Sequence, residues 1–114
     1  IVGISSVAGE RGRANNYIYG SAKAGFTAFL SGLRNRLYKS NINVITVLPG
    51  PVFTKMTKGL PLPKLLTNTK ENVADDIYEA VINKKDIVYT FKIWSLIMCI
   101  IKLIPERIFK TKKI

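Results

Sequence analysis

Short, continuously apolar runs alternate along this chain with longer stretches in which apolar residues recur every three or four positions. The apolar runs at 1–5, 42–48 and 87–90 predict buried strands, because a strand covered on both faces is apolar throughout. The helical spacing predicts helices over about 15–40 and 72–83. Strand, helix, strand, helix, strand is the order of an α/β fold with a parallel sheet. These elements amount to half of a doubly wound sheet.

The first predicted helix is the longest element, and its ends carry recognisable signals. Asn15 or Asn16 can cap its amino terminus, and Arg34, Arg36 and Lys39 suit the helix dipole in its last turns. Its apolar positions also offer a surface for an interface between copies. They are Ile18, Ala22, Phe26, Phe29, Leu30, Leu33 and Leu37.

Two stretches have the composition of loops. Residues 7–13 contain two glycines among charged residues and predict a surface loop. Residues 53–69 are predicted to be irregular, and a loop of that length is often functional. Lys55, Lys58 and Lys64 in it could meet a phosphate-bearing substrate, but solvated lysines are the favoured interpretation.

The carboxy-terminal segment differs in composition from the rest of the chain. We therefore divide the chain into residues 1–90 and residues 91–114. Residues 94–104 predict an almost uniformly apolar helix that is too short to span a bilayer. This helix can cover a substrate pocket, pack in a subunit interface, or lie at a membrane surface. Cys99 in it is expected to be buried, and the basic residues 109–113 are expected to be frayed.

Composition excludes several classes of function. The chain has 114 residues, of which 47% are hydrophobic and 22% charged, so we expect one folded domain at most. It has no histidine and one cysteine, which removes histidine-based catalysis, disulfides and the common metal sites. The net charge of +11 is split between the front and the tail, without a nucleic-acid-binding motif. We therefore expect neither a metal nor a nucleic-acid partner.

The first residues bear on the completeness of the chain. It opens at Ile1, inside an apolar strand, without the charged region and cleavage site of a signal peptide. We therefore expect it to be the back part of a longer, cytoplasmic protein.

Three residues carry candidate chemistry. Tyr19 and Lys23 are four residues apart and share one face of the first predicted helix. An ammonium one turn away stabilises a phenolate, so a tyrosine in this setting can move protons near neutral pH. Ser6 follows the first strand, at the edge where ligands of open α/β sheets bind. Its hydroxyl could hold a substrate oxygen.

Three segments together resemble the short-chain dehydrogenase/reductase family over about residues 1–90. The matching segments are Ile4–Gly9, Tyr19–Ala24 and Val47–Thr54, in the order and spacing of that family. The resemblance implies the carboxy-terminal half of a Rossmann-like doubly wound parallel sheet, extended here by the apolar carboxy-terminal helix. It also implies hydride transfer between a nicotinamide cofactor and a carbonyl or secondary alcohol.

The resemblance assigns catalytic roles to three residues of this chain. Ser6 matches the serine that hydrogen-bonds the substrate, and Ser5 fits the spacing to Tyr19 less well. Tyr19 matches the acid/base. Lys23 matches the lysine that assists the tyrosine and holds the nicotinamide ribose.

The same resemblance assigns cofactor contacts beyond the second strand. Pro49, Gly50 and Val52 match the turn that packs along the nicotinamide, and Thr54 matches a hydroxyl that contacts the carboxamide or pyrophosphate. The family's glycine-rich loop and ribose-selecting residue have no counterpart in this sequence. The resemblance implies NADP or NAD as the cofactor, and without the selecting residue the sequence does not distinguish the two; we expect NADP in preference to NAD. We expect the chain alone, which lacks the glycine-rich loop, to be inactive.

The remaining expectations concern partners. Residues 88–110 loosely resemble the tail of lipid-linked keto-pentose reductases, which implies a small-molecule or lipid-linked carbonyl substrate. We expect a homo-oligomer of the full-length protein and consider peripheral membrane contact through the tail. The alternatives to an enzyme are a non-catalytic binding protein of the same fold and a membrane-associated adaptor.

Overall fold

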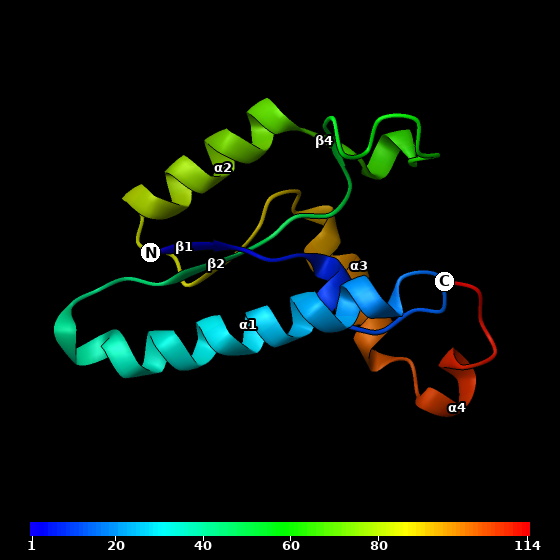
Figure 1. Cartoon of the computed structure of the whole chain (residues 1–114), viewed down its shortest axis with the longest axis horizontal. Coiled ribbons are helices and arrows are strands. Elements are labelled where there is room, and N and C mark those ends of the chain that lie inside the picture. The colour runs from blue at the N-terminus through cyan, green and yellow to red at the C-terminus, as the bar shows by residue number, and fades with distance from the viewer.

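The centre of the molecule is a parallel sheet. The computed structural model describes residues 1–114 and contains β1 (Val2–Ile4), β2 (Ile45–Leu48) and β5 (Ile87–Tyr89) in the order β1-β2-β5 (Figure 1). Val2 is paired with Ile45 and Thr46 with Ile87, and both ladders are parallel. The prediction of an α/β fold with a parallel sheet is confirmed.

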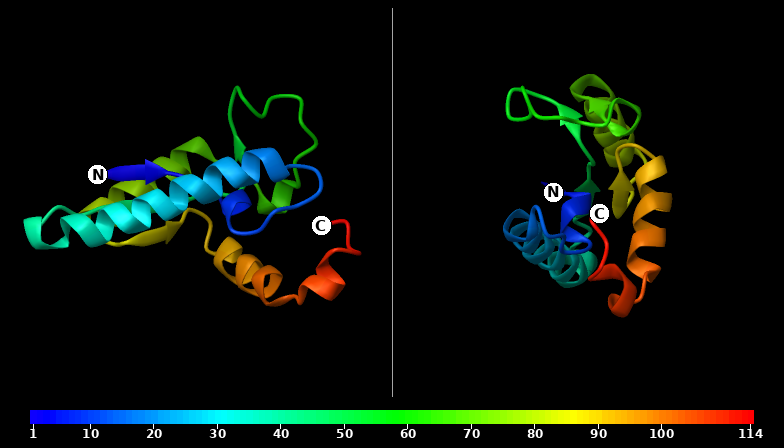
Figure 2. Two further views of the ribbon diagram at one scale, coloured as in Figure 1. Left: turned by 60° about the horizontal axis from the view of Figure 1, so that its bottom comes forward. Right: turned by 90° about the vertical axis from the view of Figure 1, so that its right-hand side faces the viewer.

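Helices cover both faces of this sheet. α1 (Tyr17–Leu37) and α2 (Lys70–Ile82) lie on opposite sides of the strands (Figure 2). Ile45 and Val47 of β2 form a buried cluster with Ala80 of α2. On the other face, Leu30 of α1 packs so closely on β1 that a Cβ at Gly3 would overlap its side chain. The central strand β2 is thus buried on both sides, as its continuous apolar sequence predicts.

The ends of α1 differ from the prediction. Asn16 occupies the amino-terminal cap position, but its side chain makes no capping hydrogen bond. The helix ends at Leu37 and continues as the 3-10 turn η2 (Tyr38–Ser40). Arg34 stabilises the start of β2 as well as the helix end, because its guanidinium donates to the carbonyl of Val44 at 2.8 Å. The same guanidinium donates to the hydroxyl of Thr46 at 2.5 Å.

Most of the apolar positions of α1 face outward. Only Gly20 and Leu30 of this helix are buried. Ile18, Phe26 and Phe29 are exposed, and the two phenylalanine rings stack with centroids 6.4 Å apart. Helical spacing therefore predicts the helix correctly, but it does not tell which apolar positions this chain buries.

The region 53–69 is more ordered than predicted. Val52–Phe53 (β3) pairs in parallel with Asn68–Thr69 (β4), and Lys64–Leu66 forms the 3-10 turn η3. The expectation of an irregular loop is wrong in these places, because backbone pairing with distant residues leaves no local sequence pattern. The side chain of Thr69 then caps α2 by accepting from the amide of Asn72 at 3.2 Å.

The carboxy-terminal segment packs back onto the rest of the chain. α3 (Ile93–Leu103) places Met98 in a buried cluster with Val7 and Leu48. α4 (Glu106–Phe109) follows, and its Phe109 is only 8% exposed. The expected fraying from Phe109 onward is therefore wrong at that residue, which a distant arginine holds in place. Cys99 is exposed rather than buried, because it lies on the side of α3 that carries Ser95 and Lys102, whereas Met98 lies on the covered side. No helix has the length and apolar composition to cross a membrane.

Candidate functional site

Ser6 ends the path of β1 and starts a tight turn. The predicted loop at 7–13 begins as one turn of 3-10 helix, η1 (Val7–Gly9), with Ser6 at its amino-terminal cap. The Oγ of Ser6 accepts a hydrogen bond from the amide of Ala8 at 3.1 Å. This bond fixes the hydroxyl at the carboxyl end of the strand, where only 8% of the residue is exposed.

Two glycines allow η1 to lie directly on α1. A Cβ at Gly9 would come within 2.7 Å of the backbone nitrogen of Ala24, and one at Gly20 within 2.8 Å of the Ala8 carbonyl oxygen. Contacts that short occur only when both positions lack a side chain. The two glycines therefore set the spacing between the Ser6 turn and the helix that carries Tyr19 and Lys23.

Tyr19 and Lys23 lie one turn apart at the start of α1. Tyr19 is 43% exposed, and the Nζ of Lys23 is 5.7 Å from the centroid of its ring. That Nζ donates to the carbonyl of Ile4 at 3.1 Å. The hydrogen bond ties Lys23 to the end of β1, and an ammonium group has further protons to offer a ligand.

The two neighbouring serines have different surroundings. The hydroxyl of Ser5 donates to the carbonyl of Lys23 at 3.0 Å and lies 2.6 Å from the hydroxyl of Thr27. Ser5 is only 2% exposed, so its hydroxyl fastens β1 to α1. Ser6 lies on the other side of the strand end, towards Pro49.

The turn after β2 is fastened to the turn after β1. The amide of Val7 donates to the carbonyl of Pro49 at 3.1 Å, and the Oγ of Ser6 lies 3.5 Å from the same oxygen. Gly50 follows, and its open Cα face is filled by the indole of Trp94 from α3. The structure thus brings Ser6, Pro49 and Gly50 together at one edge of the sheet.

Val52 and Thr54 continue from this turn. Val52 lies in β3, and Thr54 is exposed beyond it. Thr57, which the sequence does not single out, organises the segment: its Oγ1 accepts from the amide of Thr54 at 2.9 Å and donates to the carbonyl of Val52 at 2.7 Å. An open cleft of about 430 Å³ lies here, and Lys55, Lys58 and Lys70 line it. Lys64 does not line it.

Glu10 is a second residue beyond the sequence prediction. Its Oε1 accepts from the hydroxyl of Tyr89 at 2.7 Å and from the Nζ of Lys102 at 3.1 Å. Burial raises the pKa of Tyr89 above its usual range, and the hydrogen bond to Glu10 acts in the same direction. Tyr89 thus remains a neutral donor that holds Glu10 in place.

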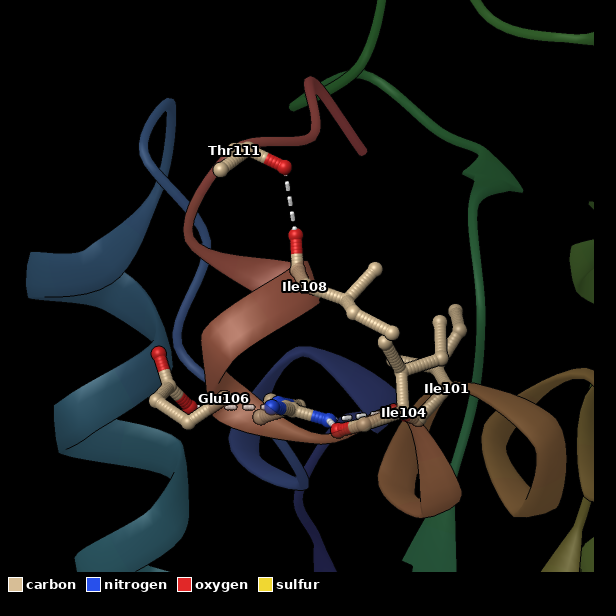
Figure 3. Close-up of polar contacts among 6 residues, drawn as sticks. Ile101, Ile104, Glu106, Ile108 and Thr111 are labelled. Atoms are coloured by element: carbon tan, nitrogen blue, oxygen red, sulfur yellow. Dashed lines mark hydrogen bonds and ion pairs between the residues drawn. The ribbon is translucent and has the colours of Figure 1, made fainter.

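Arg11 is a third. Its Nη1 donates to the carbonyls of Ile101 and Ile104 at 2.5 and 2.6 Å, and its Nη2 lies 2.9 Å from the Oε2 of Glu106 (Figure 3). Its guanidinium carbon also lies 3.8 Å from the centroid of the Phe109 ring. The adjacent opposite charges of Glu10 and Arg11 in a glycine-containing loop are the only sequence signal for these contacts.

The chain is similar to known proteins over most of its length. A model of the short chain dehydrogenase family matches residues 1–64. An uncharacterised oxidoreductase of Mycobacterium tuberculosis is 38% identical over 112 residues, which are 96% of this chain and 44% of that relative. The chain therefore spans less than half the length of that relative.

The chain is also similar to a reductase and to a solved structure. A ketoacyl reductase of Nostoc is 36% identical over 88 residues, which are 74% of this chain and 31% of that protein. The crystal structure of a short-chain dehydrogenase from Burkholderia cenocepacia, in complex with NADP, superimposes with a TM-score of 0.79 at 23% identity. The superposition covers 90% of this chain and 44% of the other. It shows a shared fold.

Proposed function

Because this chain belongs to the short-chain dehydrogenase family, we propose that it supplies the catalytic half of an NADP(H)-dependent oxidoreductase acting on a carbonyl or secondary alcohol. The observation that carries the proposal is the placement of Ser6, Tyr19 and Lys23 around one strand end. A binding protein of the same fold has no physical need for this arrangement. The ketoacyl reductase among the relatives supports a carbonyl substrate.

The residues at this edge fit the nicotinamide end of such a cofactor. Lys23 keeps ammonium protons beyond the one bonded to Ile4, and these can reach ribose hydroxyls. Pro49 and Gly50 lie at the same strand edge as Ser6, in the turn along which the nicotinamide would pack, and Trp94 fills the space beside Gly50 and so supports that turn. NADP is preferred over NAD because the Burkholderia structure holds NADP. When bound, the cofactor supplies or accepts the hydride.

The side chains of this chain then handle the substrate oxygen. Tyr19 donates its phenolic proton to that oxygen in the reducing direction and takes it back in the oxidising direction. Lys23 stabilises the phenolate left on Tyr19 through its positive charge one helical turn away. Ser6, held by the amide of Ala8, offers its hydroxyl as a hydrogen bond to the same substrate oxygen.

Substitution of Tyr19 tests this proposal in the protein produced at the length of its relatives. Tyr19→Phe should abolish NADPH-dependent carbonyl reduction and leave NADPH binding, followed by cofactor fluorescence, unchanged. Tyr17→Phe is the matched control, because Tyr17 is an exposed tyrosine two residues earlier on the same helix. Full activity of Tyr19→Phe would refute the role of Tyr19. The present chain without further residues should be inactive.

A peripheral membrane contact is a second candidate, favoured by one face of α3. Its exposed apolar side chains recur at helical spacing and continue into an open depression of about 480 Å³ beside α4. Residues 91–114 carry six cations and one acid, and that acid, Glu106, is paired with Arg11. Near an anionic lipid surface each cation contributes about 1 kcal/mol. The apolar residues of the face are Ile93, Leu96, Ile100 and Leu103.

Vesicle binding tests the membrane contact. Co-sedimentation with phosphatidylserine vesicles should be lost in Leu96→Glu and should weaken with salt. Met56→Glu is the control, because Met56 is even more exposed than Leu96 and belongs to the segment between β3 and η3 rather than to α3. Equal sedimentation of all three proteins would exclude this face as the membrane contact.

The surface for a homo-oligomer is proposed to be the outer face of α1. Its stacked Phe26 and Phe29 are exposed, although large apolar patches of this kind usually meet a partner. Phe29→Glu should shift the protein to monomer in analytical ultracentrifugation.

A further inference from the structure

We propose that Arg11 is a positioning residue for the candidate active site: it fastens the carboxy-terminal segment α3–α4 to the turn that carries Ser6. This inference rests on the proposed function, since the activity it tunes is that of Ser6, Tyr19 and Lys23.

Arg11 makes an unusually complete set of contacts for a loop residue. Its Nη1 donates to two carbonyls at the end of α3, those of Ile101 and Ile104, and the Ile101 carbonyl also accepts the amide of Ile104 at 3.2 Å. Its Nη2 pairs with Glu106, and its planar group lies over the ring of Phe109. Figure 3 shows Ile101, Ile104 and Glu106, at the junction of α3 and α4, gathered around one guanidinium group. The side chain of Arg11 is only 15% exposed, so these bonds are poorly screened by solvent.

Glu10 fastens the same loop in a second direction. Its side chain is 11% exposed and joins Tyr89, at the end of β5, to Lys102 of α3. The side chains of two adjacent residues of opposite charge therefore both bind the carboxy-terminal segment. Surface charges of a solvated loop would not be buried in this way.

The turn η1 transmits this attachment to Ser6. The amide of Glu10 donates to the carbonyl of Val7 at 3.0 Å, so the residues between Ser6 and Glu10 form one closed turn. Gly9 lies against the backbone of α1, which leaves the turn little freedom to slide. A shift at Arg11 is therefore carried to Ser6 rather than absorbed between them.

The carboxy-terminal segment also reaches the second turn of the site. Met98 of α3 shares a buried cluster with Leu48 and with Val7, the residue after Ser6. Trp94 fills the space over Gly50 and donates from its Nε1 to the carbonyl of Leu66 at 2.9 Å. α3 thus supports the turns after β1 and β2 at once, and Arg11 anchors its far end.

Variants of the protein produced at the length of its relatives test the inference. Arg11→Ala should lower kcat for carbonyl reduction by roughly 10- to 100-fold, which is the effect of small misplacements at a reacting centre. The KM for NADPH should stay unchanged. Arg11→Lys should be intermediate, because an ammonium cannot span two carbonyls and a carboxylate at once. Arg13→Ala is the matched control: Arg13 lies in the same loop and makes no side-chain hydrogen bond or ion pair.

Hydrogen exchange supplies the readout that distinguishes positioning from stability. Arg11→Ala should speed exchange in 5–12 and in 93–110, and leave α2 unchanged. If Arg11→Ala does not fold, Glu106→Gln removes only the exposed ion pair and should give the same pattern in weaker form. Faster exchange of the tail with an unchanged kcat would overturn the inference, and so would equal effects of Arg13→Ala. An inactive wild-type protein would instead refute the proposed function, while the coupling of 5–12 to 93–110 would still be measured.

Discussion

The indole of Trp94 occupies the space that a side chain at Gly50 would need. A Cβ built on Gly50 would come within 2.7 Å of the Cδ1 of Trp94, which is closer than side chains pack. Position 50 belongs to the turn that ends β2, and position 94 to the first turn of α3. The glycine of the candidate cofactor turn is thus fitted to a residue of the carboxy-terminal segment.

Gly50→Ala should therefore destabilise the protein through overpacking, by about 1–3 kcal/mol. Trp94→Phe, which replaces the indole with a smaller ring, should lower the free energy of unfolding as a single substitution. In the double variant it should recover part of the stability that Gly50→Ala loses. Urea denaturation of the four proteins gives this coupling. Additive losses would mean that the two residues do not share the space.

The contact between η1 and α1 predicts a second effect of an added methyl group. Gly9→Ala would drive a Cβ into the backbone at Lys23 and Ala24, which cannot move as a flexible side chain can. We expect a clear fall in kcat with little change in the free energy of unfolding, because the added methyl group moves the Ser6 turn away from α1. Gly25→Ala is the control, since nothing lies within 4 Å of a Cβ there. A variant Gly9→Ala with full kcat would show that this spacing does not matter.

Local pattern predicts much of this fold. The three strands of the sheet and both long helices follow from apolar runs and helical spacing, because each of them depends on residues close in sequence. The sequence predicts Ser6, Tyr19 and Lys23 as site residues for the same reason. Their roles stay predictions, but the structure places them at one strand end.

The features of the fold that the sequence does not predict depend on contacts between residues far apart in the chain. The pairing of Val52 with Asn68 and the burial of Phe109 under Arg11 join segments whose own sequences are unremarkable. The exposure of Cys99 has a different cause: it lies with Ser95 and Lys102 on one side of α3, a polar stripe that the prediction of an almost uniformly apolar helix leaves out.

Asp76 predicts a pH dependence of stability. Burial raises its pKa from 3.8, and the carboxylates of Glu79 and Asp75 act in the same direction. The folded chain therefore holds this proton more tightly than the unfolded chain. The resulting stability is fully present below the unfolded pKa and is lost as pH rises through the folded pKa.

Asp76→Asn should consequently gain stability relative to the wild type as pH rises above 3.8 and show no gain below it. Thermal unfolding at a series of pH values measures this difference. Asp75→Asn, an exposed neighbour on α2, should leave most of the dependence in place. A constant difference at every pH would contradict the assignment to Asp76.

Lys23 predicts a combined effect on binding and turnover. Lys23→Met keeps an unbranched side chain of similar length but removes the ammonium, which bonds to Ile4 and lies one turn from Tyr19. In the proposed mechanism this ammonium both holds the ribose and stabilises the phenolate. NADPH affinity and kcat should therefore fall together, whereas Tyr19→Phe should lower kcat alone. Fluorescence titration and steady-state kinetics separate the two, with Lys39→Met, exposed beyond the end of α1, as the control. Unchanged NADPH affinity in Lys23→Met would place the ribose elsewhere and leave Lys23 only its role towards Tyr19.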